Sequence, residues 1–275
     1  MVWPRWDRGA GVVSETSSSA DIGKDRNFVT ALARGLELLR CFRHGETALT
    51  NTDFAERTGL PKPTISRLTH TLCQLGYLVQ DHAGGSYRLG VGVLRLGFGV
   101  LGAADICERA VEVLRELRDG ANPYLTAALG EAHRAEVVYV AVSRSTQNVA
   151  LTMHVGSRLP LFSSAMGRAI LVGMTEDQRE TAIYAARRDL NLPENHLRDS
   201  IKTALDEYDT QGYCTGYSLW RDDVHAISVP VSTASDGRVF GLNIGGPSFY
   251  VTPEELERDH AHKLIDAARQ LGLRP

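Results

Sequence analysis

The apolar and polar positions between Thr50 and Leu89 predict two short helices joined by a tight corner and followed by a β-hairpin. In the first helix Phe54 faces inward, and Gly59 ends the helix because glycine accepts the left-handed backbone that a helix end requires. In the second helix apolar residues recur at spacings of three and four, which makes one apolar stripe. The stripe consists of Ile65, Leu68, Leu72 and Leu75. Gly76 is expected to stop this helix.

The opposite face of the second helix is polar and mildly basic, and no acidic residue occurs from Lys62 through Val79. This face consists of Lys62, Thr64, Ser66, Arg67, His70, Thr71 and Gln74. Tyr77–Gln80 and Ser86–Leu89 are expected to pair as a hairpin, since two glycines between them supply the turn. This order is the layout of a winged helix-turn-helix, whose second helix enters the DNA major groove. The alternative is a small helical subdomain with a solvated face, but corner, stripe and wing together favour DNA binding.

Local signals also mark the ends of these helices. The Thr50 hydroxyl is expected to cap the first helix while Asp53 reaches back to the cap, although Asp is a weaker partner there than Glu. Pro63 suits the first turn of the second helix, where its missing N–H costs nothing. An earlier helix is expected over Val29–Phe42, with three leucines on one side. They are Leu32, Leu36 and Leu39.

The run Leu89–Ile106 contains a glycine motif, G-x-G-x-x-G over Gly97–Gly102. Such a motif binds dinucleotides only between a strand and a helix of a βαβ unit. No strand pattern precedes it here, and the apolar residues follow a helical period. We therefore expect a linker helix over residues 91–104 whose apolar side packs on a second subunit. The run is also too interrupted by glycine and Arg95 to be a membrane helix.

The second half of the chain alternates helical patterns with β-rich runs. Helices are expected at Cys107–Asp119, Ser163–Met174, Thr175–Arg187, Leu197–Gln211 and from Thr252 to Gly272. Strands are expected at Tyr124–Leu129, Glu136–Ser143, Val149–His154, Tyr213–Leu219, Ala226–Ser232 and Val239–Gly245, with a loop at Gly156–Phe162 and a hairpin turn at Asp236-Gly237. This order indicates an α+β domain, an antiparallel sheet with helices packed on it.

Length and composition agree with two ordinary domains in 275 residues, of which 43% are hydrophobic. The formal net charge of −3 excludes binding to nucleic acid by bulk charge, but a sequence-specific DNA reader needs only a local positive face. The four cysteines are dispersed, and Cys41 and Cys73 are expected to be small core residues, which fits a reducing cytoplasm. Residues 1–26 have no apolar segment of a signal peptide and are expected to form a disordered tail.

Candidate chemistry is sparse. The segment Gly216–Trp220 lacks the final glycine of a nucleophile elbow. His260 and His262 are two positions apart, so they point to different sides of a helix and cannot share a metal; we expect both to be solvated. No nucleophile is paired with a base at a recognisable spacing. The sequence therefore predicts a protein that is not an enzyme and that has no cofactor and no metal.

Several short segments of the sequence resemble segments of the IclR-type transcriptional regulators. In the first half they are Glu56–Leu68, Leu75–Leu78 and Tyr87–Gly90, and in the second half Val155–Leu161, Ala165–Ala169, Val229–Val231 and Gly245–Pro247. The resemblance implies a mixed α/β protein of two domains: a winged helix-turn-helix over residues 27–90, the linker helix, and a GAF-like effector-binding domain over residues 105–275. It also implies a ligand-responsive regulator of catabolic genes that acts as a homodimer or as a dimer of dimers.

On this interpretation one set of side chains faces the double-stranded DNA operator. The predicted DNA-binding residues are Thr50, Lys62, Thr64, Ser66, Arg67, His70, Thr71 and Arg88. Arg67 is the strongest candidate for a base or phosphate contact, and Arg88 in the wing for a phosphate contact.

The resemblance also assigns an effector cavity. Five apolar positions match its lining: Leu151, Leu159, Ala165, Met166 and Val224. Gly216, Ala226, Asn243 and Gly245 match positions where well-known members carry Asp, Cys and two Ser, which hold a small carboxylate. Since those polar groups are missing, we expect a larger or more aromatic organic acid in a roomier cavity. The remaining candidate donors are Ser163, Ser164, Asn243, Trp220 and the N–H groups that open the helix at Ala165.

Three alternatives remain open at this point. The residues at the cavity positions could be core residues without a role in ligand binding, because only a fold-level analogy supports a pocket. The chain could be a small-molecule-binding module or an enzyme whose winged domain serves protein contacts. It could also be a dimerisation module without an effector.

Overall fold

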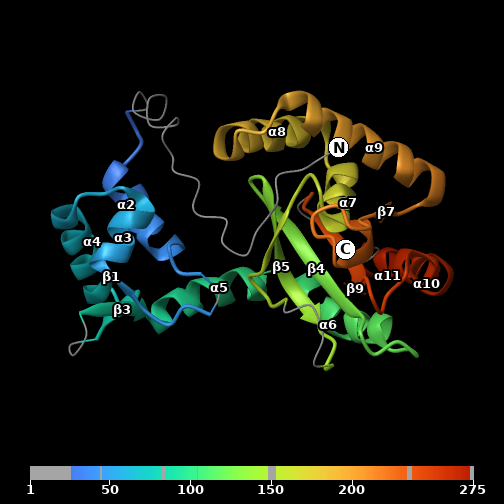
Figure 1. The fold of residues 1–275 in the computed structure, drawn as a ribbon, viewed down its shortest axis with the longest axis horizontal. Helices are drawn as coiled ribbons and strands as arrows, with labels where there is room; N and C mark the ends of the chain where they lie inside the picture. Colours follow the sequence, from blue (N-terminus) through green and yellow to red (C-terminus); the bar gives the residue numbers. More distant parts are fainter. Residues whose placement is uncertain are drawn as a thin grey trace. The chain divides into compact units, whose positions relative to one another are not determined.

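The computed structural model describes residues 26–43, 45–81, 85–103, 105–147, 153–233 and 237–272. The described residues form two compact units, one ending at Ala103 and the other beginning at Asp105 (Figure 1). Each unit has its own hydrophobic core. The expected tail, up to Asp25, lies outside the described residues. No helix in the described ranges is both long enough and apolar enough to cross a bilayer.

The described residues of the N-terminal unit form four helices and a small antiparallel sheet. Its elements are α2 (Thr30–Arg40), β1 (Leu49–Thr50), α3 (Asn51–Thr58), α4 (Lys62–Gln74), β2 (Leu78–Gln80), β3 (Ser86–Leu89) and α5 (Val91–Ala103). The strand order is β1-β3-β2, so the predicted hairpin is present and carries a third strand. The sequence missed β1 because a two-residue strand leaves no periodic signal; it exists through the pairing of Leu49 with Tyr87.

The predicted ends of α3 and α4 are confirmed. The Thr50 hydroxyl accepts a hydrogen bond from the Asp53 N–H, and the Asp53 carboxylate accepts one from the Thr50 N–H at 2.7 Å. Gly59 has a left-handed backbone with φ of 67°. Pro63 lies in the first turn of α4, and Gly76, with φ of 75°, follows its last turn. The corner of the helix-turn-helix is therefore fixed by local chemistry.

The predicted stripe of α4 needs one correction. Ile65 and Leu72 are buried, but Leu75 is 62% exposed because the helix has ended at Gln74 and Leu75 no longer follows its period. Thr69 takes the vacant place in the stripe and is fully buried. Its hydroxyl donates to the Ile65 carbonyl at 3.0 Å, which satisfies the polar group inside the core.

Only part of the predicted apolar side of α2 faces outward, because Leu39 is partly buried against the core. Leu32 and Leu36 are exposed, and the helix instead turns Gly35 and Leu38 toward the core. The core of this unit is formed by Leu38, Cys41, Leu49, Phe54, Ile65, Leu72, Leu78 and Tyr87. Residues from all three strands and from the first three helices thus meet in one cluster.

The C-terminal unit is an α+β domain, as predicted. Its helices are α6 (Asp105–Arg118), α7 (Ala165–Gly173), α8 (Glu176–Leu190), α9 (Glu194–Gln211), α10 (Pro253–Glu255), the π-helix η1 (Leu256–His260) and α11 (Ala261–Gly272). Its strands are β4 (Thr126–His133), β5 (Glu136–Ser143), β6 (Arg158–Pro160), β7 (Cys214–Thr215), β8 (Val224–Ser232) and β9 (Val239–Pro247). They form one antiparallel sheet in the order β6-β5-β4-β9-β8-β7. Helices α6 and α11 cover one face of this sheet, and α7 covers the other (Figure 1).

Several predicted elements of this unit differ in the structure. The expected loop at Gly156–Phe162 contains β6, which pairs with β5, and the expected strand Tyr213–Leu219 is reduced to β7. Of the expected strand Val149–His154, the first four residues lie outside the described ranges and the last two belong to no strand. The expected turn residue Asp236 also lies outside them, whereas Gly237 has φ of 66°. These short edge strands depend on their partners more than on their own sequence.

Glycines bring α7 close to the sheet. A Cβ atom on Gly241 would lie 2.5 Å from Met166 Cγ, and one on Gly130 would collide with the same side chain. Residues of β9 alternate between the two faces of the sheet, so Asn243 and Gly245 share the α7 side with Gly241. Asn243 and Gly245, two of the positions predicted for the effector cavity, therefore lie on this face.

Candidate DNA interface and effector site

The polar face of α4 is open to solvent. Lys62, Ser66, Arg67, His70 and Thr71 are exposed, and Thr64 is half-buried. Among the described residues, the side chains of Lys62 and Arg67 have no carboxylate partner and no hydrogen-bond acceptor. Two cations on a face without acids are therefore free to meet phosphate groups or base edges.

Two of the predicted DNA-binding threonines already use their hydroxyls within the protein. The Thr50 hydroxyl donates to the Asp53 carboxylate at 2.7 Å, and this cap lowers the pKa of Asp53. The Thr71 hydroxyl donates to the Arg67 carbonyl at 3.0 Å. In the wing, Arg88 is exposed on β3, opposite Val79 of β2. Thr50 thus shapes the start of α3, while Arg88 projects from the hairpin.

An ion pair fixes the segment before α3. Arg57 donates two hydrogen bonds to the Glu46 carboxylate, at 2.6 and 2.8 Å, and a third to the Cys41 carbonyl at 2.6 Å. The guanidinium lowers the pKa of Glu46 to about 2. Since Cys41 follows the last residue of α2, Arg57 ties the end of α2 to α3.

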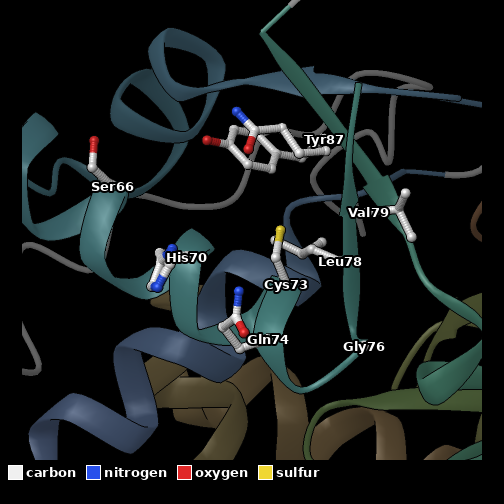
Figure 2. A pocket seen from close by; sticks show the side chains of 9 residues that line it. Ser66, His70, Cys73, Gln74, Gly76, Leu78, Val79 and Tyr87 are labelled. Carbon is white, nitrogen blue, oxygen red and sulfur yellow. The ribbon is translucent and has the colours of Figure 1, made fainter. Parts of the chain in front are cut away.

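A groove of about 500 Å³ runs between α4 and the hairpin, and we call it the helix–wing groove (Figure 2). Its lining consists of Ser66, His70, Cys73, Gln74, Gly76, Leu78, Val79, Gln80 and Tyr87. Ser66 and His70 belong to the predicted DNA-binding set, whereas Gln80 and Cys73 do not. Cys73 was predicted to be a core residue and is only half-buried. The spacing of Ser66, His70 and Gln74 is the signal that could have indicated this side of α4.

The predicted effector residues are brought together at the start of α7 and on the facing part of the sheet. Those that are buried are Leu159, Ser163, Ser164, Ala165, Met166, Gly216, Val224, Ala226, Asn243 and Gly245. Trp220 is half-buried and packs against the core cluster, with the Arg221 guanidinium 5.5 Å from its ring centroid. Leu151 lies outside the described residues.

The two serines before α7 differ in what they can still bind. Ser164 caps the helix: its hydroxyl accepts from the Gly167 N–H at 3.1 Å and donates to the Pro160 carbonyl at 2.7 Å. Ser163 is 1% exposed, and its hydroxyl has no hydrogen-bond partner among the described residues. Of these two serines, only Ser163 is therefore available as a donor to a ligand.

Asn243 is another buried polar residue of the predicted cavity. It is 7% exposed, and its side chain makes no hydrogen bond within the described ranges. The strand register places it in a row with Val142, Ala128 and Ser228, which share its face of the sheet. Ser228 is occupied, because its hydroxyl donates to the Leu242 carbonyl at 2.8 Å. Asn243 is thus a buried amide among small neighbours.

The two glycines that replace polar family residues are closely packed. A Cβ atom on Gly216 would lie 2.8 Å from both the nitrogen and the Cβ of Ala165, and one on Gly245 would lie 2.6 Å from the Cβ of Ala226. The absence of a side chain at Gly216 lets the segment after β7 lie directly against the start of α7. In this chain a polar side chain at either position would require the surrounding backbone to shift.

A buried ion pair holds α7, α9 and β7 together. Arg168 is 5% exposed, and its guanidinium pairs with the Glu207 carboxylate at 2.8 Å and donates to the Thr215 carbonyl at 2.6 Å. Glu207 in turn accepts a hydrogen bond from the Thr215 N–H at 3.2 Å. The only buried cation near the predicted cavity is thus already neutralised, among the residues that the structure describes.

The described ranges hold no group of three or more His, Cys, Asp or Glu residues that could bind a metal. Ser218 and His225 do approach each other, at 3.4 Å, but the Ser218 hydroxyl donates to the Asp222 carbonyl at 2.9 Å, so the pair is not an activated nucleophile. The expectation that His260 is solvated is wrong: it is 4% exposed in the π-helix, and burial lowers its pKa.

Comparison with known proteins agrees with this geometry. The IclR helix-turn-helix domain model matches residues 31–82, and the model of the bacterial transcriptional regulator IclR C-terminal domain matches residues 98–273. The HTH-type transcriptional regulator TsaQ1/TsaQ2 of Comamonas testosteroni is 35% identical, over 80% of this chain and 79% of its own length. The Pca regulon regulatory protein of Pseudomonas putida is 30% identical, over 90% of this chain and 84% of its own.

Solved structures show the same fold. An IclR family transcriptional regulator from Brucella abortus is 40% identical and superposes with a TM-score of 0.76, covering 90% of this chain and 93% of its own. An IclR homologue from Microbacterium hydrocarbonoxydans, complexed with 4-hydroxybenzoate, is 20% identical with a TM-score of 0.63, covering 88% and 97%. The relatives are transcriptional regulators and not enzymes. The chain therefore belongs to the IclR family of bacterial transcriptional regulators.

Proposed function

We propose that the chain is a ligand-responsive regulator of catabolic genes that binds a specific DNA operator through α4 and the wing. The observation that carries the proposal is the exposed face of α4, where Lys62 and Arg67 have no partner among the described residues. Residues 27–90 form the DNA-binding domain, residues 91–104 the linker, and residues 105–275 the effector-binding domain. We assign Arg67 a contact with a base or a phosphate in the DNA major groove. Arg88 in the wing is assigned a contact with a phosphate.

Arg67→Ala tests the DNA face. We expect operator affinity to fall by about 1–3 kcal/mol if the guanidinium makes a bidentate contact with a base. Gel-shift titrations at several salt concentrations measure the loss. Arg269→Ala is the matched control, because Arg269 is 69% exposed on α11 and lies in the other unit. Unchanged affinity of the Arg67 variant would mean that another face of α4 contacts the DNA.

We further propose that the effector is an organic or aromatic acid bound between the start of α7 and the sheet. At this place Ser163 and Asn243 are buried polar side chains that have no hydrogen-bond partner among the described residues, and both can donate to a carboxylate. The first N–H groups of α7 favour an anion at the same place. Because Arg168 is neutralised by Glu207, the carboxylate would be held by neutral donors and by this helix end. The 4-hydroxybenzoate complex of the Microbacterium homologue suggests which acid to try first.

Calorimetric titration tests the effector. The full-length protein is titrated with 4-hydroxybenzoate and then with a panel of aliphatic and aromatic acids. We expect one member to bind, and Asn243→Ala to weaken that binding about tenfold or more, since a charge-assisted hydrogen bond contributes about 1.5–3 kcal/mol. Thr203→Ala on the exposed side of α9 is the control. No heat from any member, with operator binding intact, would contradict the effector proposal.

The apolar surface of α5 supports a homodimer. Val91, Leu94, Leu96, Phe98 and Val100 are all more than half exposed on this helix. Its only charged residue in the described range is Arg95. An exposed apolar patch of this kind marks an interaction surface, and we propose that a second copy of the chain covers it, in a dimer or a dimer of dimers. A dimer would also present two copies of α4 to two operator half-sites.

A further inference from the structure

We infer that the helix–wing groove seats one sugar–phosphate strand of the operator, held by neutral side chains from both walls. The inference rests on the proposed DNA binding and adds contacts to it. It brings in Gln74 and Gln80, which the prediction of the DNA-binding set did not include. It also assigns their role: positioning on the backbone and not recognition of a base.

The first argument is geometric. The major and minor grooves of a duplex are separated by one sugar–phosphate strand. If α4 enters the major groove and the wing contacts the duplex beside it, the strand between them must cross the space between α4 and the hairpin. The helix–wing groove is that space, with Ser66, His70, Cys73 and Gln74 along one wall and the hairpin along the other (Figure 2).

The second argument is continuity with the exposed face of α4. Ser66 and His70 line the groove and also belong to this face, so a duplex that reaches one surface reaches the other. Among the described residues no Asp or Glu lines the groove, and its floor is apolar, with Leu78 1% and Tyr87 7% exposed. The described lining therefore presents no carboxylate to a polyanion.

The third argument concerns the donors. The amides of Gln74 and Gln80 and the ring of His70 can donate to phosphate oxygens, and amide contacts of this kind fix the register of a protein on DNA without specifying its sequence. Because the glutamines carry no charge, their contacts release no counterions from the DNA. The groove should therefore add affinity that is nearly independent of salt, in contrast to Lys62.

The double variant Gln74→Ala/Gln80→Ala tests this prediction. Two neutral hydrogen bonds correspond to about a tenfold loss of affinity, and the loss should be similar for operator and for unrelated duplex DNA. The slope of log affinity against log salt should stay unchanged, whereas Lys62→Ala should reduce it by about 1. Gln270→Ala, exposed on α11, is the control for loss of a surface glutamine. Unchanged affinity of the double variant, or a loss confined to the operator, would overturn the inference.

Cys73 offers a second test that does not depend on affinity. It is half-buried in the groove, whereas Cys41, Cys107 and Cys214 are buried, so alkylation of the folded protein should modify Cys73 first. Burial raises the pKa of its thiol, which calls for mildly alkaline conditions. With operator DNA at about 100 times its Kd, N-ethylmaleimide should modify Cys73 at least about tenfold more slowly.

The outcomes separate the two proposals. If the protein binds the operator and Cys73 is alkylated at the same rate as without DNA, the groove is not occupied and the inference fails while DNA binding stands. If no duplex binds the wild-type protein, the proposed DNA binding itself fails. Protection of Cys73 together with a salt-independent loss in the double glutamine variant supports the seated strand.

Discussion

The ion pair between Arg57 and Glu46 should govern the stability of the N-terminal unit. Glu46→Gln keeps the shape of the side chain and leaves the hydrogen bond from Arg57 to the Cys41 carbonyl in place. It removes the negative charge that the guanidinium contacts through two hydrogen bonds. The variant therefore measures what the charge contributes to holding α2 and α3 together.

The magnitude follows from the pKa of Glu46, which falls from 4.5 to about 2 in the folded protein. At about 1.36 kcal/mol per pKa step, this shift sets an upper bound of about 3.4 kcal/mol. The two side chains are 19% and 28% exposed, so solvent screening should reduce the contribution to about 1–2 kcal/mol. Because the folded pKa lies below the unfolded one, this stability is fully present above about pH 4.5 and is lost as the pH falls toward 2.

Hydrogen exchange of the full-length protein measures the stability of each of the two units separately. In Glu46→Gln, peptides from α2, α3 and α4 should exchange about 5–30-fold faster at neutral pH, as a loss of about 1–2 kcal/mol requires. Peptides from the C-terminal unit should not change. Glu180→Gln is the matched control, since its pair with Arg198 is nearly half exposed and should contribute little. Equal exchange in wild type and Glu46→Gln would refute the argument, as would a difference that persists as the pH approaches 2.

Three further predictions concern other parts of the molecule. Gly59→Ala should lower the melting temperature, since its left-handed backbone costs a Cβ-bearing residue about 1–2 kcal/mol, whereas Gly120→Ala, which has open space and an ordinary φ, should not. Glu207→Gln should destabilise the C-terminal unit by about 2–3 kcal/mol in urea titrations, because it leaves the buried Arg168 without its counter-charge; a loss below that of a surface pair would contradict this. Phe98→Asp should shift the protein from dimer to monomer in sedimentation velocity, and an unchanged sedimentation coefficient would exclude α5 from the interface.

The helix-turn-helix was predictable because its signals are local. The Thr50–Asp53 cap, the left-handed Gly59 and Pro63 in the first turn of α4 each act within a few residues, and all three were predicted correctly. The segments of both halves that resemble the IclR family likewise predicted the fold. A periodic pattern also predicted α4, but it misplaced Leu75, since periodicity alone does not state where a helix ends.

Tertiary structure decided the features that depend on distant partners. β1 and β6 are strands only because they pair with β3 and β5, and their own two or three residues carry no periodic signal. The burial of His260 follows from the π-helix, whose extra residue per turn changes which side chains face the core. Neither strand pairing nor a π-turn can be inferred from neighbours in the sequence.

The candidate sites divide in the same way. The sequence by itself determined which residues line the polar face of α4, because one helix period fixes which side chains share a face. Only the fold showed that Ser164 is used as a cap, while Ser163 and Asn243 have no hydrogen-bond partner among the described residues. Likewise, only the folded structure reveals the groove between α4 and the hairpin. Caps, turns and faces are set by residues a few positions apart, whereas cavities and unpaired groups depend on segments that folding brings together.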